Sequence, residues 1–180
     1  MKIAVIAWGS LVWDPRDLDI EPEWREDGPL LPVEFARFSG RERLTLVLVE
    51  GVPLQQTLWT LSRQPTLAAA ISDLRAREGT SLANIHCWRR GANLEVRCQV
   101  DSSIEDWLQR KQFDCAIWTA IGPNDPERKP GVATEEQRIA YLKRLVETGK
   151  AEAAREYFER TPAQIITPLR GRVREELGWN

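Results

Sequence analysis

A chain of 180 residues is long enough for one domain that buries roughly 70% of its unfolded surface. Hydrophobic residues make up 42% and charged residues 29%, which is typical of globular proteins and argues against long disordered stretches. With 25 basic and 27 acidic residues the net charge is -2, so the composition predicts no nucleic-acid partner and no attraction to an anionic membrane. It carries no signal of oligomeric state.

The first elements in chain order are predicted to be strands. Residues 2–8 are predominantly apolar and end before Gly9, which predicts a strand buried on both faces. This stretch is too short for a secretory signal, and no segment approaches the length of a membrane span, so we expect a cytoplasmic protein. Val33–Phe38 and Arg43–Val49 should pair as an antiparallel hairpin around residues 39–42, and Gln55–Leu61 should form a further strand.

The turn of this hairpin is rich in arginine. Arg37, Arg41 and Arg43 cluster there and can attract an acidic ligand. Because Glu34 and Glu42 lie among them, a solvated charged turn is the favoured interpretation.

The middle of the chain alternates helix and strand signals. The segment 66–77 has a helical period, with Thr66 as its cap and Gly79 at its end. Ile85–Trp88 and Leu94–Val100 are predicted to form a second hairpin. Further elements are expected here: a short helix capped by Ser102-Ser103 and a strand over Cys115–Ile121.

The last third is predicted to be helical. Residues 122–133 contain three prolines and two glycines, which predicts a loop that is either a plain connector or a lid. Thr134–Gln137 is a capping box for a helix whose buried face is expected to hold Ile139, Leu142, Leu145 and Val146. Two more helices are expected, one over Ala151–Arg160 and one opened by Thr167-Pro168.

Because strands dominate the first part and helices the last, the order favours an α+β fold over a doubly wound parallel sheet. We expect a strand-rich mixed sheet, or a small partly closed barrel, packed by helices in a single domain over residues 1–180.

The cysteines and the histidine do not suggest metal or nucleophilic chemistry. Cys87, Cys98 and Cys115 share no CxxC spacing and are predicted to be buried thiols. His86 is the one histidine, and a strand would place it and Cys87 on opposite faces. We therefore expect no metal site and no cofactor.

Two weak signals point to a small-molecule site. The predicted first strand stops at Trp8-Gly9-Ser10-Leu11, where successive backbone N–H groups at a sharp turn can hold a carboxylate or phosphate. A plain bend that binds nothing is the alternative. Glu78 ends the predicted helix just before Gly79, at the negative end of the helix dipole. The dipole disfavours the ionised form of a carboxylate there, and general acid/base catalysis needs a carboxyl group that is disfavoured in this way. Against this, Arg75 and Arg77 can hold Glu78 ionised, and most such glutamates are surface groups.

The order of these parts resembles the γ-glutamylcyclotransferase-like family. In that family a first strand leads into a Tyr-Gly-Ser loop, and a Glu-Gly pair that ends a later helix supplies the catalytic acid/base. The counterparts here are Trp8-Gly9-Ser10-Leu11 and Asp73-Leu74-Arg75-Ala76-Arg77-Glu78-Gly79, and the resemblance covers roughly residues 3–160.

The resemblance implies cleavage of a γ-glutamyl amine or peptide by its own α-amine, which releases 5-oxoproline without metal or cofactor. Gly9, Ser10 and Leu11 would bind the substrate carboxylate beside Trp8, and Glu78 would be the acid/base. Trp8 stands where the family usually has tyrosine, and an indole cannot accept a hydrogen bond as a phenol does. The alternatives are an inactive small-molecule-binding or regulatory module and, with less support, an interaction protein with a tryptophan-rich surface.

Overall fold

The computed structural model describes residues 1–91 and 99–180. Its chain forms two compact units, one made of Met1–Leu31 with Gln56–Ile121 and the other of Pro32–Gln55 with Gly122–Asn180. Two very short strands, β2 (Leu30–Leu31) and β5 (Gln55–Gln56), lie next to the points where the chain passes from one unit to the other. Within the described residues, no helix has the length and apolar character needed to cross a bilayer.

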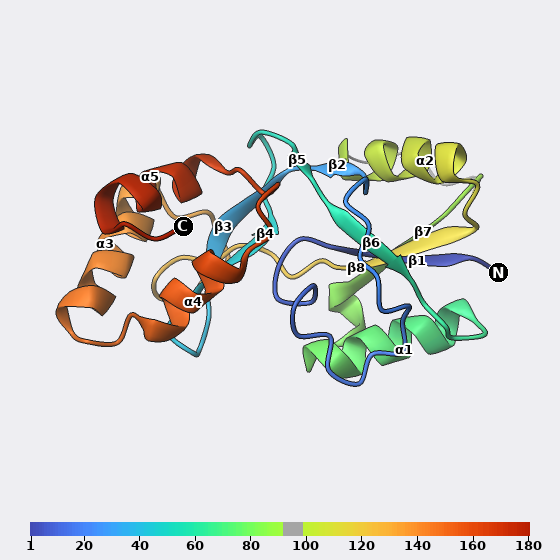
Figure 1. Ribbon diagram of the computed structural model, residues 1–180, viewed down its shortest axis with the longest axis horizontal. Helices are drawn as coiled ribbons and strands as arrows, with labels where there is room; N and C mark the ends of the chain where they lie inside the picture. The colour runs from blue at the N-terminus through green and yellow to red at the C-terminus, as the bar shows by residue number, and fades with distance from the viewer. Residues whose placement is uncertain (92–98) are drawn as a thin grey trace. The chain divides into compact units, whose positions relative to one another are not determined.

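The first unit is built on a mixed sheet, shown in Figure 1. Its strands are β1 (Ile3–Ala7), β6 (Leu58–Leu61), β7 (Ile85–Arg89) and β8 (Cys115–Thr119), in the order β6-β1-β8-β7. β1 runs antiparallel to β6 and parallel to β8, and β7 runs antiparallel to β8. The mixed sheet is confirmed. Because β6 and β7 are the outermost strands of this order and do not pair with each other, the described residues form no closed barrel.

A helix covers each face of this sheet (Figure 1). α1 (Leu67–Glu78) packs Leu67, Ala70 and Leu74 against a core that includes Ile3, Val5 and Ile117. On the other face, Trp107 of α2 (Gln99–Lys111) contacts the ring of Trp59 on β6 at 5.6 Å between centroids. β1 is therefore buried on both faces, as its apolar sequence predicts.

The caps of α1 are confirmed. The Thr66 side chain accepts a hydrogen bond from the backbone N–H of Ala69 at 3.2 Å. Gly79 takes the left-handed conformation with φ 61°, which glycine adopts without steric cost, and it ends the helix. Glu78 is therefore fixed as the last residue of α1.

Two sequence predictions for this unit need correction. The single strand over Gln55–Leu61 is divided into β5 and β6, and between them Thr57 bonds through its backbone and its hydroxyl to residues 28 and 29. β7 pairs antiparallel with β8, and most of the strand 94–100 that was predicted to pair with β7 lies outside the described residues. Residues 99 and 100 already belong to α2, which therefore begins before the predicted Ser102-Ser103 cap.

The second unit combines the predicted hairpin with helices. β3 (Val33–Phe38) pairs antiparallel with β4 (Leu44–Leu48), as expected. The predicted capping box is also confirmed, because the side chains of Thr134 and Gln137 each accept the backbone N–H of the other. The helices of this unit are α3 (Glu135–Glu147), α4 (Glu152–Arg160) and α5 (Pro168–Leu177). Val146 was expected in the core but is 47% exposed.

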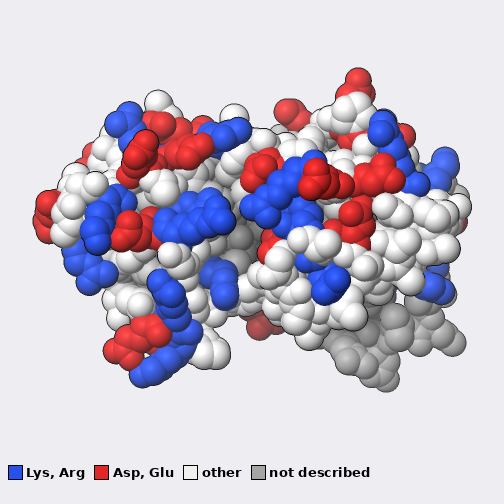
Figure 2. Space-filling view, turned by 90° about the horizontal axis from the view of Figure 1, so that it is seen from below, with Lys and Arg blue, Asp and Glu red and all other residues white. Residues whose placement is uncertain are grey.

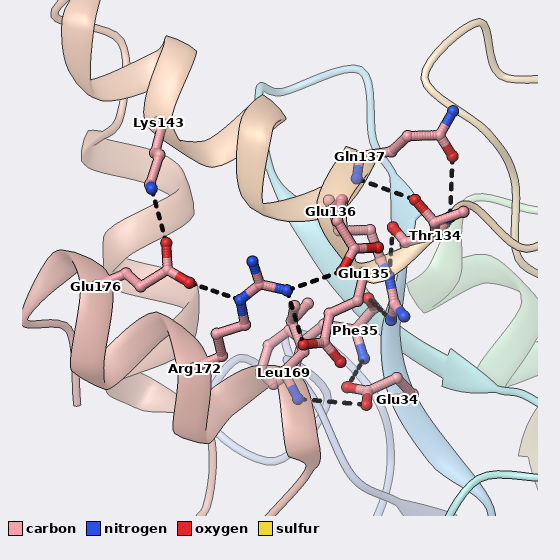
Figure 3. A network of polar contacts seen from close by, with 11 residues as sticks. Glu34, Phe35, Thr134, Glu135, Glu136, Gln137, Lys143, Leu169, Arg172 and Glu176 are labelled. Atoms are coloured by element: carbon pink, nitrogen blue, oxygen red, sulfur yellow. Dashed lines mark hydrogen bonds and ion pairs between the residues drawn. The ribbon is translucent and has the colours of Figure 1, made fainter.

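Aromatic packing and a charged network hold this second unit together. Phe35 of β3 stacks on Phe158 of α4 with 4.0 Å between ring centroids. Figure 3 shows Arg172 of α5 between Glu135, at 3.0 Å, and Glu176, at 2.5 Å. This arginine joins the start of α3 to α5.

Charges of both signs are exposed on the face drawn in Figure 2. On the face shown in Figure 2, lysine and arginine side chains are interspersed with aspartate and glutamate side chains. This agrees with the near balance of 25 basic and 27 acidic residues.

The cysteines differ in exposure. Cys115 of β8 is buried as expected, but Cys87 is exposed, because β7 is an edge strand, and its prediction as a buried thiol is wrong. Cys98 lies outside the described residues. Burial raises the pKa of the Cys115 thiol to about 11.

We expect iodoacetamide at pH 8 to alkylate Cys87 in the folded protein and to spare Cys115. The thiolate is the nucleophile, and a group with a pKa near 11 is only roughly 0.1% ionised at pH 8. Alkylation of Cys115 should rise as the pH approaches 11, or when the protein is unfolded. Peptide mass mapping measures each cysteine separately, and equal native labelling of the two would contradict the structure.

Candidate functional site

The turn after β1 is the first part of the candidate site. The backbone N–H of Val12 donates to the Gly9 carbonyl and that of Asp14 donates to the Ser10 carbonyl, both at 2.9 Å. The chain therefore coils as at a helix start, and the N–H groups of Gly9, Ser10 and Leu11 have no acceptor within this described turn. This is the donor arrangement that the Gly-Ser sequence suggested.

The side chains on either side anchor this turn in the first unit. Trp8 is only 6% exposed, and Leu11 belongs to the same core as Leu67 and Leu74 of α1. The Leu11 side chain thus holds the turn against the helix, so only its backbone is available to a ligand. Ser10 is partly exposed.

Glu78 is the second part of the site. Its side chain is 17% exposed, and its Oε1 accepts from Nη1 of Arg77 at 2.6 Å. The helix dipole disfavours a carboxylate at this end by about 0.3–1 kcal/mol. At this end the Glu78 carboxylate is instead paired with the guanidinium of Arg77.

Arg77 connects Glu78 to the turn after β1. Its side chain is only 4% exposed, and its Nε donates to the Asp14 carbonyl at 3.1 Å while Nη2 donates to the same oxygen. In return, Arg16 donates from Nη1 to the Arg77 carbonyl at 2.9 Å. The turn and the end of α1 are therefore tied to each other by hydrogen bonds from arginine side chains to backbone carbonyls.

The two sequence-predicted parts lie in the same compact unit. The link between them is indirect: among the described residues, Glu78 bonds to Arg77, and no bond joins it to Gly9, Ser10 or Leu11. The connection runs from Ser10 to Asp14, from Asp14 to Arg77 and from Arg77 to Glu78.

Sequence reasoning missed the role of Asp14 and Arg16. Arg16 has a positive φ of 53° and pairs with the Asp14 carboxylate at 3.4 Å, so this short segment folds back onto α1. The Asp-Pro-Arg run directly after the turn was the available signal. For metals, the described residues contain no group of three or more histidine, cysteine or acidic side chains suited to a metal ion.

Comparison of the chain with models of protein families, with curated proteins and with solved structures finds no match. The resemblance to the γ-glutamylcyclotransferase-like family therefore rests on the short motifs at Trp8–Leu11 and Glu78-Gly79.

Proposed function

We propose that the chain is a γ-glutamylcyclotransferase-like enzyme acting on a γ-glutamyl amine or peptide. The observation that supports this most is the Arg77 bridge, which ties the end of the helix bearing Glu78 to the turn at Gly9–Leu11, whose N–H groups have no acceptor among the described residues. A donor turn and a carboxylate within one packed unit are the two elements this reaction needs.

In the proposed reaction the N–H groups of Gly9, Ser10 and Leu11 bind the α-carboxylate of the substrate. This orients the α-amine toward the γ-carbonyl carbon and removes much of the entropic cost of ring closure. The amine nitrogen forms a bond to that carbon, and Glu78 accepts the proton that the amine loses. Glu78 then returns the proton to the leaving nitrogen as the original C–N bond breaks, which gives 5-oxoproline and a free amine.

Arg77 has a defined part in this cycle. Its ion pair with Glu78 and its bonds to the Asp14 carbonyl fix the position of the carboxylate at the end of α1.

A second candidate is a module that binds a carboxylate ligand without chemistry. Two observations favour it: Trp8 stands where the family usually has tyrosine, and the Glu78 carboxylate is already engaged by Arg77. In this alternative the same turn binds the ligand, and Glu78 serves to fix Arg77 against Asp14.

The proposal is tested by incubating the full chain with γ-glutamyl amino acids, γ-glutamyl amines and glutathione, and measuring 5-oxoproline by mass spectrometry. Release of 5-oxoproline from one of these classes supports the enzyme. Saturable binding of γ-glutamyl compounds without any 5-oxoproline would support the module, and neither turnover nor binding would overturn both.

A further inference from the structure

The turn end of the β3–β4 hairpin in the second unit carries several arginines. Acidic residues close to them in sequence suggested that the positive charge of these arginines is neutralised. Glu34 and Glu42 were expected to balance Arg37, Arg41 and Arg43. The structure assigns each of these two acids to another partner.

Glu34 is turned into the interior. It is 3% exposed, and its carboxylate accepts the backbone N–H of Phe35 at 2.7 Å and that of Leu169 at 3.5 Å (Figure 3). Leu169 is in the first turn of α5, where a carboxylate is favoured by the helix dipole. Glu34 therefore stabilises the start of α5 and does not pair with the arginines of the turn.

Glu42 is also engaged elsewhere. It sits at the turn with φ 55° and pairs with Lys150 at 3.4 Å. Among the described residues, Arg37 and Arg43 have no carboxylate within ion-pair distance, and the same holds for Arg128 of the loop 122–133. The turn end thus has a positive excess.

Polar groups at this turn end also lack partners. The Ser39 N–H donates to the Arg43 carbonyl at 2.8 Å, and this bond closes the turn. Because side chains alternate along a strand, Arg37, Ser39 and Arg43 lie on the same face of the hairpin. Ser39 Oγ and Arg43 Nε are buried and have no hydrogen-bond partner among the described residues. A buried donor without an acceptor is unfavourable, so an added acceptor at this place is stabilising.

The loop 122–133 brings a further cation to the same turn. Asn124 fastens the loop to β3, accepting from the Phe38 N–H at 2.7 Å and donating to the Phe38 carbonyl at 3.1 Å. Arg37 adds a bond from Nη1 to the Gly122 carbonyl at 2.8 Å. Arg128 then reaches the turn, where its Nη1 lies 3.8 Å from the position a Cβ on Gly40 would occupy.

The chemistry of these groups favours a phosphate. A guanidinium offers several N–H donors in a planar fork that matches phosphate oxygens, and a hydroxyl adds one more donor. Partial burial lowers the pKa of Arg37 because its charge loses solvation, which a nearby anion would restore.

We propose that this turn end, formed by Arg37, Ser39, Arg43 and Arg128, binds the phosphate group of a small molecule. The proposal does not depend on the cyclotransferase function, because it rests on other residues in the other unit. Arg43 Nε and Ser39 Oγ donate directly to the phosphate, and Arg37 and Arg128 supply charge.

The test is a calorimetric or NMR titration of the full chain with inorganic phosphate and, separately, with glycerol phosphate. We expect saturable binding in the millimolar range, weakened at least about tenfold by Arg43→Gln because a hydrogen bond to a charged group is lost. Stronger binding of glycerol phosphate than of inorganic phosphate would identify a phosphomonoester as the ligand, and the reverse would identify free phosphate.

Two further variants keep the test decisive. Ser39→Ala removes only a hydroxyl and should weaken binding while leaving the fold intact, even if Arg43→Gln perturbs the contact of Arg43 with the Tyr157 ring. Arg174→Gln is the matched control, because Arg174 is an exposed arginine on α5 in the same unit. Absence of saturable phosphate binding, equal binding of acetate, or equal loss in Arg174→Gln would overturn the proposal.

Discussion

Glu78→Gln is expected to lower kcat for 5-oxoproline release by roughly 10²–10⁴-fold, the usual contribution of a positioned acid/base. Glutamine keeps the size of the side chain and can still accept a hydrogen bond from Arg77, but it cannot take the proton from the attacking amine. Binding of the substrate should be largely retained, because the N–H groups of the turn are unchanged. The measurement is kcat and KM on the best substrate of the γ-glutamyl panel.

Glu23→Gln is the matched control, since Glu23 is an exposed glutamate in the same unit. It should leave kcat within about twofold of the original, as expected for a surface substitution. If Glu78→Gln also retained kcat to that degree, Glu78 would not be the proton carrier, whichever substrate is turned over. A drop in kcat with an unchanged melting temperature excludes unfolding as its cause.

The elements that sequence reasoning found correctly are those with a local signal. β1 is an apolar run followed by Gly9, and α1 begins at the Thr66 cap and ends at Gly79. The β3–β4 hairpin likewise follows from two apolar runs separated by a short turn. In each case the residues that decide the element are neighbours in sequence.

Elements decided by distant contacts were harder to predict. The parallel pairing of β1 with β8 joins Ile3 to Cys115, and nothing in either strand specifies its partner. For α2, the apolar residues Val100, Ile104 and Trp107 follow a helical period, but the strand-like pattern before them led to a late predicted start. Where two periods overlap, packing decides the boundary.

The candidate site shows the same division. The sequence marks the turn by Gly9-Ser10 and the helix end by Glu78-Gly79. The bridge between the two depends on one long side chain, that of Arg77. Adjacent helix positions do not normally face each other, so spacing alone does not predict the bond from Arg77 to Glu78. It forms at the end of α1, where Arg77 is also held by the Asp14 carbonyl from the turn.

Arg77→Met is expected to destabilise the first unit by about 3 kcal/mol. The substitution removes the ion pair with Glu78 and both bonds to the Asp14 carbonyl, and it leaves a mostly buried carboxylate and a backbone oxygen without their partner. Urea unfolding followed by tryptophan fluorescence measures this, because every tryptophan except Trp179 belongs to the first unit.

The control for charge and helix position is Arg75→Met, two residues earlier in the same last turn of α1. Arg75 is only partly buried, and its replacement should change stability by no more than about 0.5 kcal/mol. Arg77→Lys should fall between the two variants, because an ammonium keeps the charge but lacks the planar fork that reaches Glu78 and Asp14 together. Equal stability of the Arg75 and Arg77 methionine variants would show that the bridge contributes nothing.

A double-mutant cycle separates the two halves of the bridge. If the ion pair dominates, Arg77→Met should cost much less when Glu78 is already glutamine, since no buried charge is then left unpaired. If the bonds to Asp14 dominate, the cost should be nearly the same in both backgrounds. The first result would mean that Glu78 stabilises the same turn that it is proposed to serve in the reaction.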